Sequence, residues 1–140
     1  MWAVPTPEQV LALGPSGVAV ATGMEAVRAE RVVGVARAAD AGALDAAALV
    51  ALAEDEARRR LRTIPGIGPF YGDLILIRAT GMTDILPLDE PQLWRHVTDL
   101  YGLESLPDRA QALRLAEGWS PWRTWVGVLI RAAARRVLKN

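Results

Sequence analysis

The residues with the clearest chemical potential form the connection "IPGIG", residues 64–68, between two strongly helical segments. Pro65 presets the backbone for a first turn, and Gly66 and Gly68 permit backbone angles that are closed to other residues. We expect the N–H groups of Ile67, Gly68 and the following first helical turn to lack intrahelical partners. With the positive end of the helix dipole behind them, they would bind an anion such as a phosphate. The alternative is a tight helix–helix turn without a ligand.

A second notable stretch, "LPLDEPQLW", places two adjacent carboxylates, Asp89 and Glu90, at an apparent helix start. Asp89 lies three residues before Gln92, which is the spacing of a capping box. On this interpretation Asp89 caps the helix, and Glu90 is a solvated first-turn acid that complements the helix dipole.

Helix signals recur along the whole chain, so we predict an all-α protein, a multi-helical array without strands. Thr6 is the expected N-cap of the first helix, with Pro7 at its first position and Gln9 completing a capping box. Asp45 and Ser120 are expected to cap later helices. The predicted helical segments are 6–14, 16–22, 24–42, 45–64, 69–80, 89–102, 107–118 and 120–139.

Composition limits the class of protein. The 140 residues, 51% of them hydrophobic, suit one helical domain spanning 1–140 or part of a larger one. The absence of cysteine excludes disulfides, thiolate zinc sites and cysteine-ligated iron–sulfur clusters, and is compatible with a cytoplasmic protein. Sixteen basic and sixteen acidic residues cancel, so any DNA binding must come from local geometry. The apolar runs are too short for a membrane span, and no signal peptide is visible.

The hairpin resembles the helix-hairpin-helix motif of DNA-binding proteins, here over about 46–80. The positions that fill the motif are Leu61, Ile64, Pro65, Gly66, Ile67 and Gly68. The order of hairpin, apolar helix, "ILPLDEPQLW" and "AEGWSPWRTWVGVLIR" is similar to the helix-hairpin-helix DNA glycosylase superfamily, and within it to the 3-methyladenine DNA glycosylase II branch. "PTPEQVLAL" and "GALD" extend the likeness over nearly the whole chain.

This resemblance implies a monofunctional DNA glycosylase of base excision repair, acting on double-stranded DNA. Such an enzyme hydrolyses the N-glycosidic bond of alkylated bases, such as 3-methyladenine, that are flipped out of the duplex. The family carries a catalytic aspartate after the hairpin unit. Register from the following "LWRHV" assigns this role to Glu90, whereas residue type and the preceding "LP" give Asp89 a slight preference.

Phe70 bears on the type of glycosylase. Bifunctional members of the superfamily carry a lysine nucleophile at this position, and the only lysine here is Lys139, so lyase activity is not expected. In the alkylbase branch an aromatic residue at this position lines the base pocket, which makes Phe70 a pocket wall and Tyr71 a weaker candidate. Arg131 replaces a further pocket aromatic. We expect no metal held by side chains and no other cofactor, although hairpin carbonyls in this family often hold a monovalent cation.

The resemblance begins inside the family's domain, as if the chain were truncated at its N-terminus. The apolar surface that the missing first helices normally cover would then serve self-association or a partner. Two other readings remain open: a non-catalytic or degenerate helix-hairpin-helix DNA-binding module, and an accessory helical interaction protein. Base release from alkylated duplex DNA separates the glycosylase from both.

Overall fold

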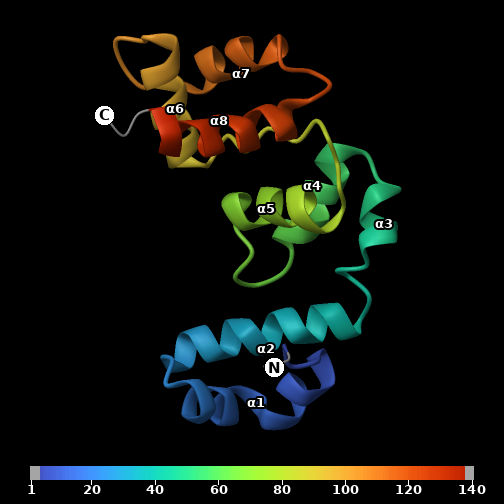
Figure 1. Ribbon diagram of the computed structural model, residues 1–140. Coiled ribbons are helices and arrows are strands. Elements are labelled where there is room, and N and C mark those ends of the chain that lie inside the picture. The colour runs from blue at the N-terminus through green and yellow to red at the C-terminus, as the bar shows by residue number, and fades with distance from the viewer. Residues whose placement is uncertain (1–3, 138–140) are drawn as a thin grey trace. The chain divides into compact units, whose positions relative to one another are not determined.

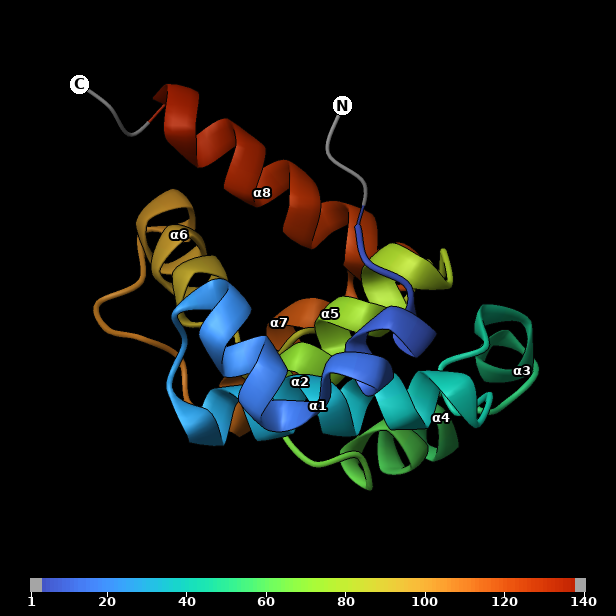
Figure 2. The same ribbon diagram turned by 90° about the horizontal axis from the view of Figure 1, so that it is seen from below.

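Every regular element in the computed structural model, which describes residues 4–137, is a helix (Figures 1 and 2). The all-α prediction is therefore confirmed for this part of the chain. The eight helices found there are α1 (Pro7–Thr22), α2 (Ala26–Asp40), α3 (Ala46–Val50), α4 (Glu54–Arg62), α5 (Pro69–Ala79), α6 (Pro91–Tyr101), α7 (Arg109–Glu117) and α8 (Arg123–Val137). They fall into two compact units, one ending at Gly68 and the other beginning at Pro69.

In the first unit, α1 and α2 form an antiparallel pair (Figure 1). The predicted capping box of Thr6 and Gln9 is present at the start of α1. Gly14 interrupts this helix with φ 64° and ψ 176°, so the two helices predicted on either side of it are two parts of α1. Val18 and Val33 pack in the small core between α1 and α2.

The helix predicted over 45–64 is two helices, α3 and α4, and the prediction of one helix is wrong. Asp45 caps α3 as expected, with its carboxylate accepting a hydrogen bond from the Ala47 amide at 2.9 Å. Ala53 has an extended backbone (φ −62°, ψ 147°) and is the N-cap of α4, so it separates α4 from α3. The acidic first turn of α4, residues 54–56, and its basic last turn both complement the helix dipole, which allows this short helix to begin on its own.

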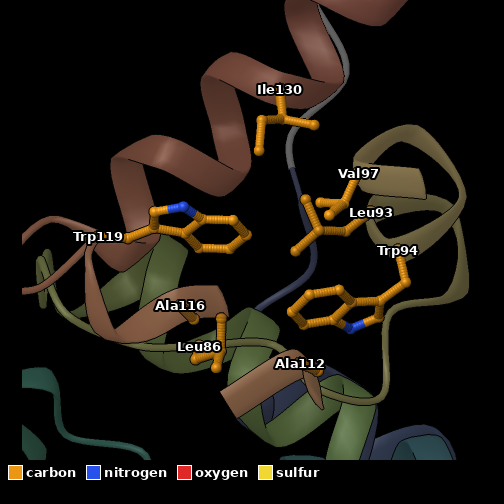
Figure 3. Packing of buried hydrophobic residues seen from close by; sticks show 8 residues of the cluster. All are labelled: Leu86, Leu93, Trp94, Val97, Ala112, Ala116, Trp119 and Ile130. Atoms are coloured by element: carbon orange, nitrogen blue, oxygen red, sulfur yellow. The ribbon is translucent and has the colours of Figure 1, made fainter. Parts of the chain in front are cut away.

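The second unit is held together by a core that α6, α7 and α8 share (Figure 3). The rings of Trp94 and Trp119 stack with their centroids 6.0 Å apart, and the Trp119 indole N–H donates to the Tyr101 hydroxyl at 3.1 Å. The core residues are Leu86, Leu93, Trp94, Val97, Ala112, Ala116, Trp119 and Ile130. This core fixes α6 relative to α8, the two helices on which the site described below depends.

The start of α8 differs from the sequence prediction. Ser120 does not cap this helix, because its hydroxyl donates to Asp84 at 2.8 Å and α8 begins only at Arg123. The amide of Arg123 also donates to Asp84, at 3.2 Å, so a carboxylate distant in sequence takes the capping role. Local sequence cannot reveal such a cap, because its acceptor lies in the connection between α5 and α6.

The tryptophans near α8 divide into two kinds. Trp119 packs in the core, whereas Trp122 and Trp125 are 56% and 55% exposed. Lys139 lies outside the described residues. Within the described chain, no helix is both long and apolar enough to cross a membrane.

Candidate functional site

The hairpin of the first unit is a tight turn formed by residues 63–68. Gly66 adopts φ 92°, a conformation that strains any residue with a side chain. The Ile67 amide donates to the Ile64 carbonyl at 3.0 Å, and the Ile67 side chain is buried. The Ile67 N–H has no intrahelical partner, as expected, but this turn bond engages it within the hairpin. Within this unit, the N–H group of Gly68 remains a candidate anion donor.

Arg31 of α2 lies directly against this hairpin, which the sequence did not indicate. A Cβ placed on Gly66 would come within 3.1–3.3 Å of the Cβ, Cγ and Cδ atoms of Arg31. Because Gly66 has no side chain, it leaves room for the aliphatic part of Arg31. Arg31 itself remains exposed. A guanidinium carried beside the turn adds positive charge to it.

Two of the basic residues that precede the hairpin are engaged within the first unit. Arg58 forms an ion pair with Glu54 one helical turn away, and Arg60 donates to the Gly42 carbonyl at 3.3 Å. Arg59 and Arg62 are exposed. Of the four arginines within 58–62, these last two are the more accessible.

A small cavity of about 70 Å³ lies in the second unit, between α5, the α5–α6 connection, α6 and α8. Phe70 lines it, and its expected role as a wall of a base pocket stays a prediction. Tyr71 does not line it, because its side chain points outward and is 58% exposed. The cavity-lining residues that matter below are Phe70, Arg78, Glu90, Leu93, Thr124 and Arg131.

Glu90 is the acidic residue that lines this cavity, and it is only 7% exposed. It is the N-cap of α6, since its Oε1 accepts a hydrogen bond from the Gln92 amide at 3.3 Å. The capping role assigned to Asp89 is therefore wrong. Asp89 is exposed and lies outside the cavity, so the structure does not bring the two carboxylates together at one site.

The second carboxylate oxygen of Glu90 has an unusual environment. Its Oε2 lies 3.0 Å from Nη1 of Arg131, yet the approach lacks the geometry of a hydrogen bond and the oxygen is fully buried. The Arg131 side chain is 43% exposed, so solvent screens its end of the ion pair. A buried carboxylate oxygen without a hydrogen bond is costly, and here the ion pair with Arg131 offsets part of that cost.

The connection 80–90 positions Glu90 because it is fastened to the start of α8. Thr124 is buried, and its hydroxyl accepts a hydrogen bond from the Ile85 amide at 3.0 Å and donates to the Met82 carbonyl at 2.9 Å. Asp84 receives the two bonds from Ser120 and Arg123 already described. These long-range bonds carry no local sequence signal, so sequence reasoning missed both Thr124 and Asp84.

The last residues before α6 are held separately. The Glu90 amide donates to the Pro87 carbonyl at 3.2 Å, which closes a turn, and the Trp94 indole N–H donates to the Leu88 carbonyl at 3.0 Å. Through Trp94 this turn is tied to the core of the second unit. The result is a preorganised carboxylate facing a cavity with an aromatic wall, an arrangement suited to stabilising positive charge on a bound group.

No group of three or more His, Asp or Glu side chains in the part of the chain described could hold a metal ion. His96, on α6, is half-buried.

Comparisons with known proteins define the class of this fold. No protein-family model matches the chain. Solved structures of 3-methyladenine DNA glycosylases share its helical fold, and the chain shows distant homology to these enzymes over most of its length. This confirms the resemblance seen in the sequence.

The particular relatives are bacterial, archaeal and fungal. The chain is 25% identical to the DNA-3-methyladenine glycosylase of Bacillus subtilis over 124 residues, covering 89% of this chain and 41% of that protein. It is 29% identical to DNA-3-methyladenine glycosylase 2 of Escherichia coli over 121 residues, covering 86% of this chain and 39% of the relative. The chain thus spans about two-fifths of the length of these two relatives.

Among solved structures, that of Schizosaccharomyces pombe 3-methyladenine DNA glycosylase Mag1 in complex with abasic DNA aligns with a TM-score of 0.80 and 23% identity, covering 94% of this chain and 64% of that one. The enzyme of Archaeoglobus fulgidus aligns with a TM-score of 0.78 and 22% identity, over 100% of this chain and 46% of that one. At these identities the structures establish the fold.

Proposed function

We propose that this chain provides the catalytic part of a monofunctional DNA glycosylase, with Glu90 as its catalytic carboxylate. The observation that carries the proposal is the burial of Glu90 at the N-cap of α6, facing a cavity walled by Phe70. The distant relatives named above are 3-methyladenine DNA glycosylases, which supports damaged, and first of all alkylated, bases in duplex DNA as substrates.

Breaking an N-glycosidic bond develops positive charge on the sugar, in an oxocarbenium-like transition state. A fixed carboxylate lowers the free energy of that state and can orient or deprotonate the attacking water. Glu90 is suited to this because the cap bond from Gln92 and the turn at Pro87 hold it in place. Flipping the base out of the duplex costs a few kcal/mol and is easiest for damaged pairs. Phe70 would then stack on the flipped base.

No lysine nucleophile occupies the first turn of α5, where Phe70 stands. The reaction therefore ends with hydrolysis and leaves an abasic site with its backbone intact. The hairpin Pro65–Gly68, with Arg31 beside it, would hold a DNA phosphate through backbone N–H groups and one guanidinium.

The test is release of methylated bases from alkylated duplex DNA by the wild-type chain and two isosteric variants. Glu90→Gln keeps a capping oxygen but removes the charge, and we expect release to fall by about 100–1,000-fold. Asp89→Asn is the matched control, and we expect a change below about twofold because Asp89 is exposed. The reverse pattern would show that the catalytic carboxylate is Asp89.

One observation favours a second candidate, a DNA-binding module without catalysis. Arg131 pairs with the Glu90 carboxylate, and the cavity holds no more than a few water molecules as it stands. If the wild type releases no base but binds duplex DNA in a salt-dependent manner that Gly66→Ala weakens, this second function holds.

A further inference from the structure

The carboxylate that lines the cavity of the second unit is paired with a cation of the same chain. Among the residues that line the cavity, Glu90 carries the one buried charge, because Arg78 is exposed and the Arg131 side chain is 43% exposed. Oε2 of Glu90 is fully buried without a hydrogen bond and lies 3.0 Å from Nη1 of Arg131. The cavity therefore presents a buried negative charge, and a guanidinium occupies the position next to it.

Arg131 is also the lining side chain that an entering base would have to move. The cavity of about 70 Å³ has room for a few water molecules and cannot take the ring system of a nucleobase. Leu93 and Thr124 are buried, and hydrogen bonds to Ile85 and Met82 hold Thr124 in place. The Arg131 side chain is partly exposed and long, so it can swing toward solvent.

The departure of Arg131 from Glu90 is costly by itself. It would leave a buried carboxylate oxygen with neither a hydrogen bond nor a counterion, and a buried charge without compensation is strongly unfavourable. Another positive group at Glu90 offsets this cost. A cationic alkylated base brings such a group, and so does the sugar as its glycosidic bond breaks. The phosphates of the same nucleotide flank that sugar, so an acceptor for the released guanidinium arrives with it.

We propose that the ion pair of Glu90 and Arg131 closes the cavity in the free chain and that DNA opens it by an exchange of charges, a proposal that rests on the function proposed above. Arg131 leaves Glu90 for a phosphate beside the flipped nucleotide. Glu90 in turn faces the positive charge of the alkylated base or of the sugar. The exchange keeps every charge paired and frees the carboxylate when substrate occupies the site, so Arg131 is a positioning residue that acts through Glu90.

The first test removes the ion pair and measures access to the cavity. Arg131→Met keeps an unbranched side chain but has no charge to hold Glu90. The 1,9-dimethyladeninium cation, which carries no phosphate, should bind this variant about fivefold more tightly than the wild type, because no ion pair has to be broken. NMR titration of the 140-residue chain measures both affinities. Arg78→Met is the matched control, because Arg78 lines the same cavity while Glu90 pairs with Arg131, and should change the affinity by less than about twofold.

The second test asks whether the released guanidinium moves to DNA. Two duplexes share their phosphates and differ at an abasic site: a pyrrolidine carries a positive charge where the sugar develops it, and a tetrahydrofuran is neutral. With the pyrrolidine duplex, Arg131→Met should make the slope of log affinity against log salt shallower by about 1. With the tetrahydrofuran duplex the slope should not change, because Arg131 stays on Glu90. Fluorescence anisotropy measures both slopes.

A second variant guards against a folding defect in Arg131→Met. The amide of Arg131→Gln can donate a hydrogen bond to Glu90 but carries no charge, so it should show the same change of slope with the pyrrolidine duplex. A cation affinity that does not rise in Arg131→Met, an unchanged slope with the pyrrolidine duplex in both variants, or equal slope changes with the two duplexes would each overturn the proposal.

Base release from alkylated duplex DNA separates the failure of this inference from the failure of the proposed function. A wild type that releases bases, with a cation affinity that Arg131→Met does not raise, keeps the glycosylase function and overturns the charge exchange. A wild type that releases no base, with both expected effects of Arg131→Met, keeps the charge exchange and overturns the glycosylase function.

Discussion

The hairpin of the first unit and the pocket of the second are built by different means. The hairpin uses backbone conformation: Gly66 at φ 92° and the Ile67–Ile64 bond shape it within five residues. The pocket uses side chains drawn from α5, α6 and α8, which hydrogen bonds and ion pairs join across long stretches of sequence. Short-range backbone sites tolerate change nearby but not at their glycines, whereas side-chain sites depend on distant support.

The largest effect is expected on the free energy of unfolding, from a substitution in the core that supports the pocket. Trp119→Ala removes a ring that stacks on Trp94 and should lower the free energy of unfolding by about 3–5 kcal/mol. Urea unfolding followed by circular dichroism measures it. Trp122→Ala, three residues away and 56% exposed, is the matched control, with an expected change within about 0.5 kcal/mol. Equal effects of the two substitutions would contradict the assignment of the core.

The next effect concerns the fastening of the connection that carries Glu90. Thr124→Val leaves the Ile85 amide without its acceptor in a buried position, so we expect a loss of about 1–3 kcal/mol and a fall in base release. Unfolding and single-turnover assays measure the two. Thr98→Val is the control, because its hydroxyl only donates back to the Trp94 carbonyl within α6. If Thr124→Val is as benign as Thr98→Val, the fastening does not position the site.

A smaller effect is expected at the hairpin. Gly66→Ala imposes about 1–2 kcal/mol of backbone strain at φ 92°, and its Cβ meets the Arg31 stem at 3.1 Å. DNA affinity should fall up to about tenfold, measured by fluorescence anisotropy. The same substitution at Gly34, in α2 with open space around it, should be neutral or stabilising. Unchanged DNA affinity in Gly66→Ala would argue against a phosphate site there.

The smallest effect is expected on DNA affinity when the charge of Arg31 is removed and the hairpin backbone is left unchanged. Arg31→Met keeps an unbranched stem over Gly66 but removes the guanidinium. We expect the slope of log affinity against log salt to become shallower by about 1, the loss of one phosphate contact. Arg28→Met, also exposed on α2, should leave the slope unchanged. A uniform effect of both substitutions would indicate general electrostatics instead of a local contact.

The two regions also differ in how far sequence predicts them. The Pro-Gly pattern predicts the hairpin because glycine conformation is a local property, and the capping signals at Thr6 and Asp45 hold for the same reason. Phe70, for which the family resemblance implies a place in a base pocket, lines the cavity of the second unit, and its contact with a base stays a prediction. The sequence could not decide between Asp89 and Glu90, because which of two neighbours faces inward depends on how residues 80–90 are tied to α8.

The helical pattern also failed at two places in the chain. Ser120 has the residue type of an N-cap, but Asp84 takes its hydroxyl and the amide of Arg123. The continuous helical pattern of 45–64 hides a break, because three acids in the first turn of α4 favour a new start. The Ser120 error comes from a hydrogen-bond partner distant in the sequence, whereas the acids that favour the new helix start lie within 45–64 itself.

The bonds of Thr124 and Asp84 have a consequence for dissection of the molecule. The connection 80–90 and the start of α8 lie on opposite sides of the linker 102–108 in the chain, yet they recognise each other through specific hydrogen bonds. A polypeptide cut in that linker would leave Glu90 on one fragment and Arg131 on the other. Regained base release on mixing the fragments would report their reassembly, which makes this linker a natural position for a split-protein sensor.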